Sequence, residues 1–307
     1  MEETTSANGR HNRRKFILGL TRITGFTLLL NTPFVSTASN LLALKDDVTV
    51  GQIIDSFISQ VGRGAFPKTV DTLKSGSREM KVRGIVTTMF ATVEVIKKAI
   101  ALNANFIIAH EPTFYNHLDE TEWLASDDVY QYKANLLKEN GITVWRNHDY
   151  IHSLQPDGVG SGLLKQLNWA SYYDRKAGTL TLPAIPLEGL IDFLKTKLKI
   201  SKVRYIGDLK QECKKVLFIP GAAGGNTQIS LLSKIKPDVL ICGEIQEWET
   251  AEYIRDARAK GNKVSLVVLG HIASEEAGSE FMAEWLTTKF PAIKTTHIPS
   301  TNSLSFH

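Results

Sequence analysis

The stretch Asn105–His117, NFIIAHEPTFYNH, decides the fold. Its short apolar run, Phe106–Ala109, has the length and composition of a strand buried in a parallel sheet. The run ends at His110, Glu111 and Pro112, and proline prevents the strand from continuing. One strand end thus delivers an imidazole and a carboxylate together. Because ligands of open α/β sheets bind beyond the carboxyl ends of the strands, we expect the chemistry there.

The pattern around this strand occurs twice in the chain. The first series has strands at 82–86, 106–109 and 142–145 with helices at 92–102 and 129–139; the second has strands at 216–219, 238–241 and 265–269 with helices at 228–234 and 249–260. Glu111 and Glu244 occupy matching strand ends, and so do His148 and His271. Chance similarity explains the strands but not the matched side chains. We predict an α/β fold of two pseudo-symmetric lobes with mixed, largely parallel sheets around a central metal cleft.

The predicted organisation has three parts. Residues 1–38 are expected to form a signal peptide, 39–155 the first lobe, completed by 276–307, and 156–275 the second lobe. Apolar spacing predicts helices at 50–61 and 187–198, residues 62–80 are expected to form a loop, and residues 295–306 are expected to form a final strand.

Composition excludes several classes of protein. The 307 residues are 43% hydrophobic and 22% charged, which is typical of a globular protein with a sizeable core. The net charge of +4 arises largely in residues 1–38, and the remainder carries 31 basic and 30 acidic residues. This balance predicts no nucleic-acid partner. Cys213 and Cys242 form no Cys-x-x-Cys pair, so a disulfide framework is excluded.

The N-terminal segment resembles a twin-arginine (Tat) export signal. Arg13 and Arg14 precede an apolar stretch to about Leu30, and residues 36–38 form a small-x-small cleavage site. An uncleaved membrane anchor is the weaker alternative, because the apolar run is short and contains Arg22. We therefore expect a periplasmic or secreted protein with no stable membrane insertion after cleavage.

Imidazoles and carboxylates gather at the predicted strand ends. The candidates are His110, His148, His152, His271, Glu111, Glu244, Glu247 and Glu275. Such a mixture suits Zn, Mn, Fe, Co or Ni rather than calcium, and more than four ligands allow two divalent transition-metal ions to share a bridging carboxylate. Glu275 is the candidate bridge, since it lies one helical turn from His271.

The motifs IIAHEP, RNHDYIH, PGAAGG, GEIQEWE, LGHIASE and STNS resemble those of the Nif-three-like (NGG-one-interacting-factor-three) dinuclear metal-centre proteins, also named GTP cyclohydrolase I type 2. The resemblance runs from about residue 50 to the end, in the short form without an inserted domain. It implies metal ligands at His110, Glu111, His152, His271 and Glu275. Glu111 stands where the family usually has His, and His152 where it usually has Asp, so ligand number and charge are conserved. Metal identity and nuclearity stay open, and Asp149 is an alternative carboxylate.

The resemblance also implies a function and an assembly. We expect a homohexameric, metal-dependent hydrolase of an unknown small-molecule substrate, with Glu244 or Glu247 as a proton-transfer group. A non-catalytic metal-binding or metal-delivery protein is the alternative, which the exchanged ligand pair favours.

Two further features are weaker candidates. The loop Gly221–Gly225 lies between a strand and a helix and suits either an anion or a tight turn, but it matches no nucleotide-binding pattern. Trp145 and Trp248 border the motifs, where they would stack a planar substrate or pack in the core.

Overall fold

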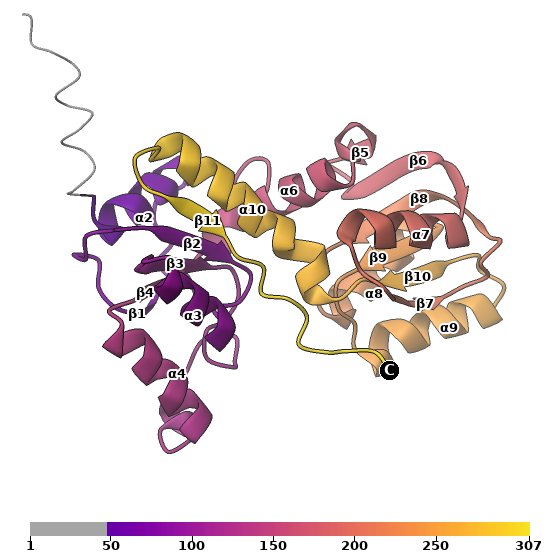
Figure 1. Ribbon diagram of the computed structural model, residues 1–307. Helices are drawn as coiled ribbons and strands as arrows, with labels where there is room; N and C mark the ends of the chain where they lie inside the picture. The colour runs from indigo at the N-terminus through magenta and orange to yellow at the C-terminus, as the bar shows by residue number, and fades with distance from the viewer. Residues whose placement is uncertain (1–47) are drawn as a thin grey trace, which may run out of the picture.

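The computed structural model describes residues 48–307. The predicted signal peptide, residues 1–38, lies outside them. Within residues 48–307 no helix has the length and apolar character needed to cross a membrane. This part of the chain forms two lobes, each built on one sheet (Figure 1).

The first lobe is built on a five-stranded sheet with the order β1-β4-β3-β2-β11. Its strands are β1 Leu73–Ser75, β2 Ile85–Thr88, β3 Phe106–Ala109, β4 Thr143–Arg146 and β11 Thr295–His297. All neighbouring pairs are parallel except β1 with β4. Every residue of β2, β3 and β4 is buried, as expected of parallel strands that are covered on both faces.

The second lobe is built on a six-stranded sheet with the order β5-β6-β8-β9-β10-β7. Its strands are β5 Tyr173–Asp174, β6 Thr179–Pro186, β7 Arg204–Ile206, β8 Glu212–Ile219, β9 Val239–Cys242 and β10 Ser265–Val268. The central strands β8, β9 and β10 are parallel, and the outer pairings are antiparallel. The structure therefore confirms the predicted fold class of two mixed α/β lobes.

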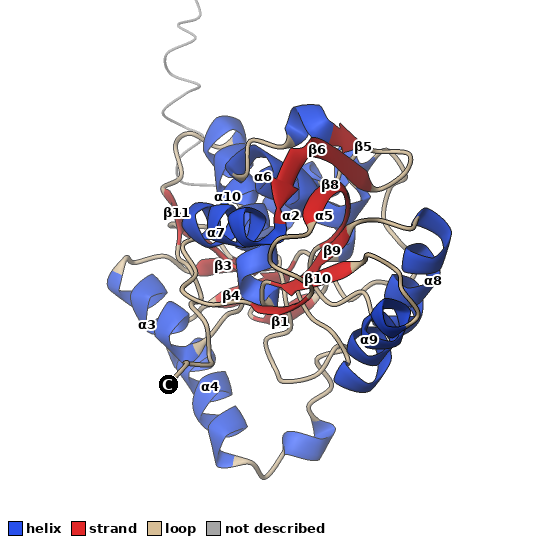
Figure 2. Ribbon diagram, turned by 90° about the vertical axis from the view of Figure 1, so that its right-hand side faces the viewer, coloured by secondary structure: helices blue, strands red, loops and turns tan. Residues whose placement is uncertain are grey.

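Helices cover both sheets. They are α2 Val50–Ile58, α3 Val93–Ala101, α4 Asp128–Glu139, α5 Asp149–Ser153, α6 Gly158–Gln166, α7 Leu187–Leu198, α8 Gly225–Ile235, α9 Glu252–Ala259 and α10 His271–Lys289, with a π-helix at Glu247–Ala251 and 3-10 turns at Ser59–Val61, Glu122–Leu124 and Ala170–Tyr172. Figure 2 shows α8 and α9 side by side along the second lobe. Leu240 of β9 packs with these two helices, whereas its neighbour Val239 packs with α7, because successive side chains of a strand face opposite sides.

The long helix α10 joins the two lobes. Ala277 belongs to the core of the second sheet, and Met282 and Leu286 belong to the core of the first. Helix α6 packs closely along it: a Cβ atom added to Gly162 would lie 2.3 Å from the Ala277 carbonyl oxygen. After α10 the chain returns as β11 to the edge of the first sheet, beside β2 (Figure 1). The last described strand therefore completes the first lobe.

The elements differ from their predicted bounds in a few places. The predicted loop at 62–80 contains the edge strand β1, whose three residues are too few to give a periodic pattern. The final strand stops at His297 rather than Phe306, and Pro299, which has no N–H group, follows closely. The helix predicted at 249–260 begins earlier, as the π-helix at Glu247.

Candidate metal centre

Three strand ends bring the predicted ligands together between the lobes. His110 and Glu111 follow β3, His148 and α5 follow β4, and His271 starts α10 after β10. Ligand atoms lie within 4.8 Å of one another in two groups that share His110: His110 with His148 and His152, and His110 with Glu111 and Glu275. His271 contacts the second group through both carboxylates. We call the six residues His110, Glu111, His148, His152, His271 and Glu275 the His/Glu cluster.

Each imidazole of the cluster is held through its Nδ1 atom. The acceptors are the Asn147 carbonyl oxygen at 3.1 Å from His110, Asp149 Oδ1 at 2.9 Å from His148, Asp157 Oδ2 at 2.9 Å from His152 and Glu244 Oε1 at 2.9 Å from His271. Because Nδ1 donates to these acceptors, Nε2 of each ring is left as the ligand atom. Acceptors of this kind orient the histidines of metal sites in proteins.

Two carboxylates complete the cluster. Glu275 Oε2 lies 3.0 Å from His271 Nε2 and 3.5 Å from His110 Nε2. Glu111 Oε1 lies 3.3 Å from His271 Nε2 and 3.7 Å from His148 Nε2. Both acids and the His110 ring are buried, and His110 Nε2 has no hydrogen-bond partner among the described residues. A buried nitrogen that faces carboxylates without a hydrogen bond suits an ion between them.

The charges in the cluster shift one another's pKa values. Burial alone would raise the pKa of Glu275, but the His110 and His271 rings beside it lower that pKa well below its usual value. Burial alone would lower the pKa of His271, but Glu111, Glu244 and Glu275 raise it to about 12. Burial and the neighbouring His110 lower the pKa of His148 to about 4. The carboxylates therefore stay ionised, as metal ligands must, and an ion bound to His271 would displace the proton that they stabilise on its ring.

Arg146 supports the cluster by forming an ion pair with Glu111. This side chain, fully buried at the end of β4, places Nη2 at 3.1 Å from Glu111 Oε2 and Nη1 at 3.6 Å from Asp119 Oδ2. The ion pair fixes one oxygen of Glu111 and turns the other toward His148 and His271. Arg146 is the first residue of the RNHDYIH motif, but the sequence analysis gave it no role.

The glycine loop after β8 contacts the cluster. Gly221 has a φ of +69°, and a Cβ atom there would lie only 2.2 Å from Glu275 Oε1. Its N–H group donates to Ser274 Oγ, at 3.0 Å, in the first turn of α10. The loop thus lies against the carboxylate of Glu275, which explains the glycine better than an anion-binding role.

Other predicted residues lie at the margin of the cluster or outside it. Glu244 is half-exposed and contacts the cluster only through His271. Glu247, the first residue of the π-helix, forms an exposed ion pair with Arg204 at 2.7 Å. Asp149 accepts hydrogen bonds from His148 Nδ1, Thr69 and the Val70 N–H group, so both of its oxygens are used.

The two candidate tryptophans have different surroundings. Trp145 is buried against Phe57 in the core of the first lobe, with ring centroids 6.1 Å apart. Trp248 is 76% exposed on the π-helix. Trp145 is thus a core residue, and stacking of a substrate on Trp248 stays a prediction.

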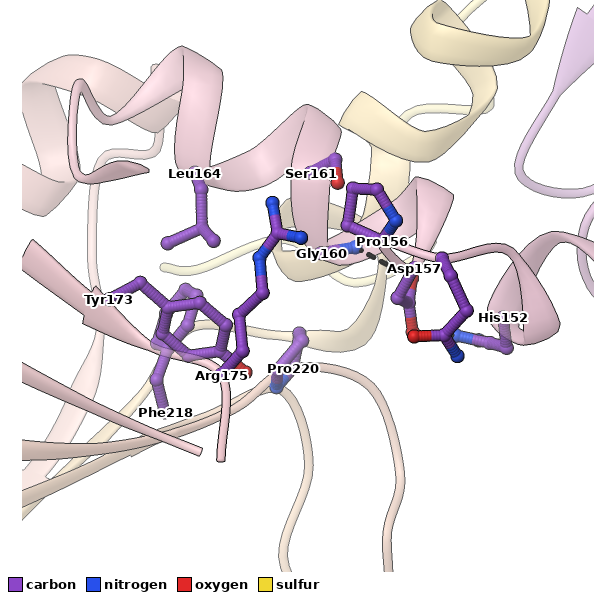
Figure 3. Close-up of a pocket in the computed structure, with 11 residues that line it drawn as sticks. His152, Pro156, Asp157, Gly160, Ser161, Leu164, Tyr173, Arg175, Phe218 and Pro220 are labelled. Carbon is purple, nitrogen blue, oxygen red and sulfur yellow. Dashed lines mark hydrogen bonds and ion pairs between the residues drawn. The ribbon is translucent and has the colours of Figure 1, made fainter. Parts of the chain in front are cut away.

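A cavity of about 240 Å³ opens beside His152 (Figure 3). It lies between α6 and the strands of the second lobe. Its lining residues are His152, Gln155, Pro156, Asp157, Gly160, Ser161, Leu164, Tyr173, Arg175, Phe218 and Pro220. Of the His/Glu cluster, His152 alone lines it.

Comparison with known sequences identifies one family. The family model described as Duf34/NIF3 (NGG1p interacting factor 3) matches residues 71–303. The GTP cyclohydrolase 1 type 2 homolog of Clostridium perfringens is 26% identical over 215 residues, which are 66% of this chain and 77% of that protein. The homolog of the same name in Chlamydia pneumoniae is 24% identical over 242 residues, 75% of this chain and 89% of that protein.

Solved structures share the fold. A hypothetical protein of Staphylococcus aureus superposes with a TM-score of 0.68 at 18% identity, covering 85% of this chain and 99% of that one. A Bacillus cereus protein related to NIF3 superposes with a TM-score of 0.66 at 16% identity, with the same coverage. At such identities the likeness shows the fold alone, and it agrees with the two-lobed architecture.

Proposed function

Because the chain belongs to the Duf34/NIF3 family, as the motif resemblance predicted, we propose that the His/Glu cluster binds divalent transition-metal ions and hydrolyses a small molecule. One observation carries the proposal: four imidazoles with tethered Nδ1 atoms direct Nε2 toward a site that also contains two buried carboxylates. The mixture of nitrogen and oxygen ligands suits Zn, Mn, Fe, Co or Ni.

The arrangement supports two ions that differ in the kinds of ligand around them. His148 and His152 lie on one side of His110, and Glu111, His271 and Glu275 lie on the other. The first group is rich in imidazole and the second in carboxylate. His148 thereby joins the five ligands that the sequence resemblance implied.

The chemistry follows from the ions and the groups beside them. Divalent ions at such a centre lower the pKa of a water molecule and polarise a substrate oxygen. Glu244 Oε1 holds the His271 ring, and Oε2 of Glu244 has no partner among the described residues, so this oxygen is available to exchange a proton with the substrate. Glu275 and Glu111 hold negative charge at the site.

The names of the relatives support a hydrolase but leave the substrate open. GTP cyclohydrolase 1 type 2 homologs would open the ring of a purine nucleotide, as their name indicates. We also propose that this chain is exported, on the strength of its N-terminal motif. An exported enzyme would act on a substrate other than GTP, which is a cytoplasmic metabolite.

Elemental analysis tests the metal centre. Protein purified without added metal should contain transition metal, with more than one ion per chain after saturation. His110→Ala should lose most of this metal, because both groups share His110. His307→Ala, which changes an exposed histidine at the C-terminus, is the matched control and should retain it. Equal metal content in both variants would contradict the proposal.

Turnover tests the hydrolase. If saturated protein hydrolyses a substrate, Glu244→Gln should reduce kcat while the metal content is unchanged. A fully loaded protein without turnover toward purine nucleotides or simple cyclic amides would instead favour metal binding or delivery.

A further inference from the structure

We propose that the cavity beside His152 binds the acid group of the substrate, and that the substrate is a small organic acid, a carboxylate or a phosphate ester, with a single ring. This inference rests on the proposed function, because it takes the His/Glu cluster as the reacting centre. It assigns Arg175 as the residue that recognises the acid.

The cavity connects the cluster to a separate binding surface. His152 lies at one side of it, and Arg175, from the turn between β5 and β6, extends through its middle, so that its guanidinium lies between Leu164 and Pro156 in the view of Figure 3. A molecule in the cavity therefore has one end beside a metal ligand and the other beside a guanidinium. This arrangement orients a substrate relative to the reacting centre.

The charges of the cavity favour an anion at the Arg175 end. Asp157, the acidic residue of the lining, is already used: Oδ2 accepts from His152 and Oδ1 accepts from the Gly160 N–H group at 2.9 Å. Arg175 makes no hydrogen bond or ion pair with any residue in the range 48–307. Its guanidinium is thus free to bind a carboxylate or phosphate through two parallel hydrogen bonds.

The remaining walls suit an apolar or aromatic body. Leu164, Phe218 and Tyr173 lie together on one side of the cavity, and Pro156 and Pro220 border the side toward His152 (Figure 3). Aromatic and aliphatic walls with few polar groups are typical of small-molecule sites. A ring held against these walls would lie beside the Arg175 guanidinium.

The volume limits the size of the substrate. A cavity of ~150 Å³ holds benzene, whereas pockets that enclose drug-sized ligands measure ~300–1,000 Å³. The value of about 240 Å³ lies between the two and matches one ring with an acid group.

Calorimetric titration of the full-length protein with benzoate and with phenyl phosphate tests the assignment. Both should bind metal-loaded protein, and Arg175→Met should weaken them by about tenfold or more, since hydrogen bonds to charged groups are strong. Lys176→Met is the matched control: it removes the next cation of the same turn, outside the cavity, and should bind like the unchanged protein. Benzamide, the neutral analogue of benzoate, should be insensitive to Arg175→Met.

Titration of chelator-treated protein separates the two proposals. Acid binding that depends on Arg175 with and without metal supports the cavity assignment. If the protein takes up no metal but still binds benzoate through Arg175, the metal centre is wrong and the cavity assignment stands. Acid binding that is lost when the metal is removed but is unchanged by Arg175→Met would overturn the assignment. The absence of any acid binding would also overturn it.

Discussion

At the scale of single residues, the cluster is shaped by side chains that are not themselves ligands. Asp157 and Asp149 hold imidazoles of the first group, Glu244 holds His271, and Arg146 holds Glu111. Each of these residues hydrogen-bonds one polar atom of a cluster side chain. The bond fixes the direction of the second polar atom, which is the candidate ligand atom. The geometry of the site therefore depends on residues one contact away from the candidate metal ligands.

Glu244 should affect metal affinity through His271. Glu244→Ala is expected to weaken metal binding by about 10–100-fold, the range for a lost partner of a metal-binding imidazole. Glu244→Gln should retain most of the affinity, because its amide oxygen still accepts from His271 Nδ1 at the same place. Competition with a chelating dye measures both. Equal losses in the two variants would show that charge, rather than orientation, is the contribution of Glu244.

Glu111 should be needed for stability as well as for metal binding. Glu111→Gln would leave the buried Arg146 with Asp119 as its remaining carboxylate partner, at 3.6 Å. We expect the free energy of unfolding of metal-free protein to fall by ~3 kcal/mol, the scale for breaking a buried ion pair. Urea unfolding measures it.

Glu284→Gln is the control for this change. It removes the Lys165–Glu284 pair, whose side chains are 70% and 63% exposed, and should cost less than ~1 kcal/mol. Similar losses for Glu111→Gln and Glu284→Gln would contradict the structural role of Arg146.

At the scale of elements, the loop between β8 and α8 positions the start of α10. Gly221→Ala should lower metal affinity, since the new methyl group would collide with the Glu275 carboxylate. Gly224→Ala is the matched control: Gly224 also has a positive φ, of +79°, but no atom lies within 4 Å of its added Cβ. Gly224→Ala should lower the free energy of unfolding by ~1 kcal/mol and leave the metal affinity unchanged. The prediction fails if both variants bind metal as the unchanged protein does.

Sequence patterns predicted the bounds of an element where those bounds depend on local periodicity. The apolar run Phe106–Ala109 and the amphipathic helix Leu187–Leu198 have the predicted bounds, because burial against the sheet sets their periodicity. Arg146 could not be predicted: a charged residue at the end of a strand is normally solvated, and only the folded chain brings Glu111 and Asp119 to it. The surface position of Glu247 could not be predicted either, because its partner Arg204 lies 43 residues away in the sequence.

At the scale of the whole molecule, the export motif makes a separate prediction. Replacing Arg13 and Arg14 by Lys should retain the precursor in the cytoplasm, because twin-arginine recognition requires more than positive charge. Both residues lie outside the described range. Fractionation and immunoblotting measure the distribution of precursor and mature protein, and mature protein outside at the normal rate would contradict export by this route.

The assembly also remains a prediction. The family resemblance implies a ring of six subunits, so light scattering on the mature protein should give about six times the subunit mass, a closed symmetric assembly. A monomer at all concentrations would exclude it. A dimer would show self-association with a different symmetry.

The return of β11 to the edge of the first sheet has a consequence for folding during synthesis. Domains generally fold in order from the N-terminus as the ribosome makes them. Here β2 pairs with β3 on one side and gains its other parallel neighbour only from Thr295–His297, and α10 supplies Met282 and Leu286 to the same core. These residues are translated after all strands of the second lobe, so the N-terminal half cannot complete its sheet until the second lobe has been made. The lobe that begins first along the chain is therefore the last to complete its sheet.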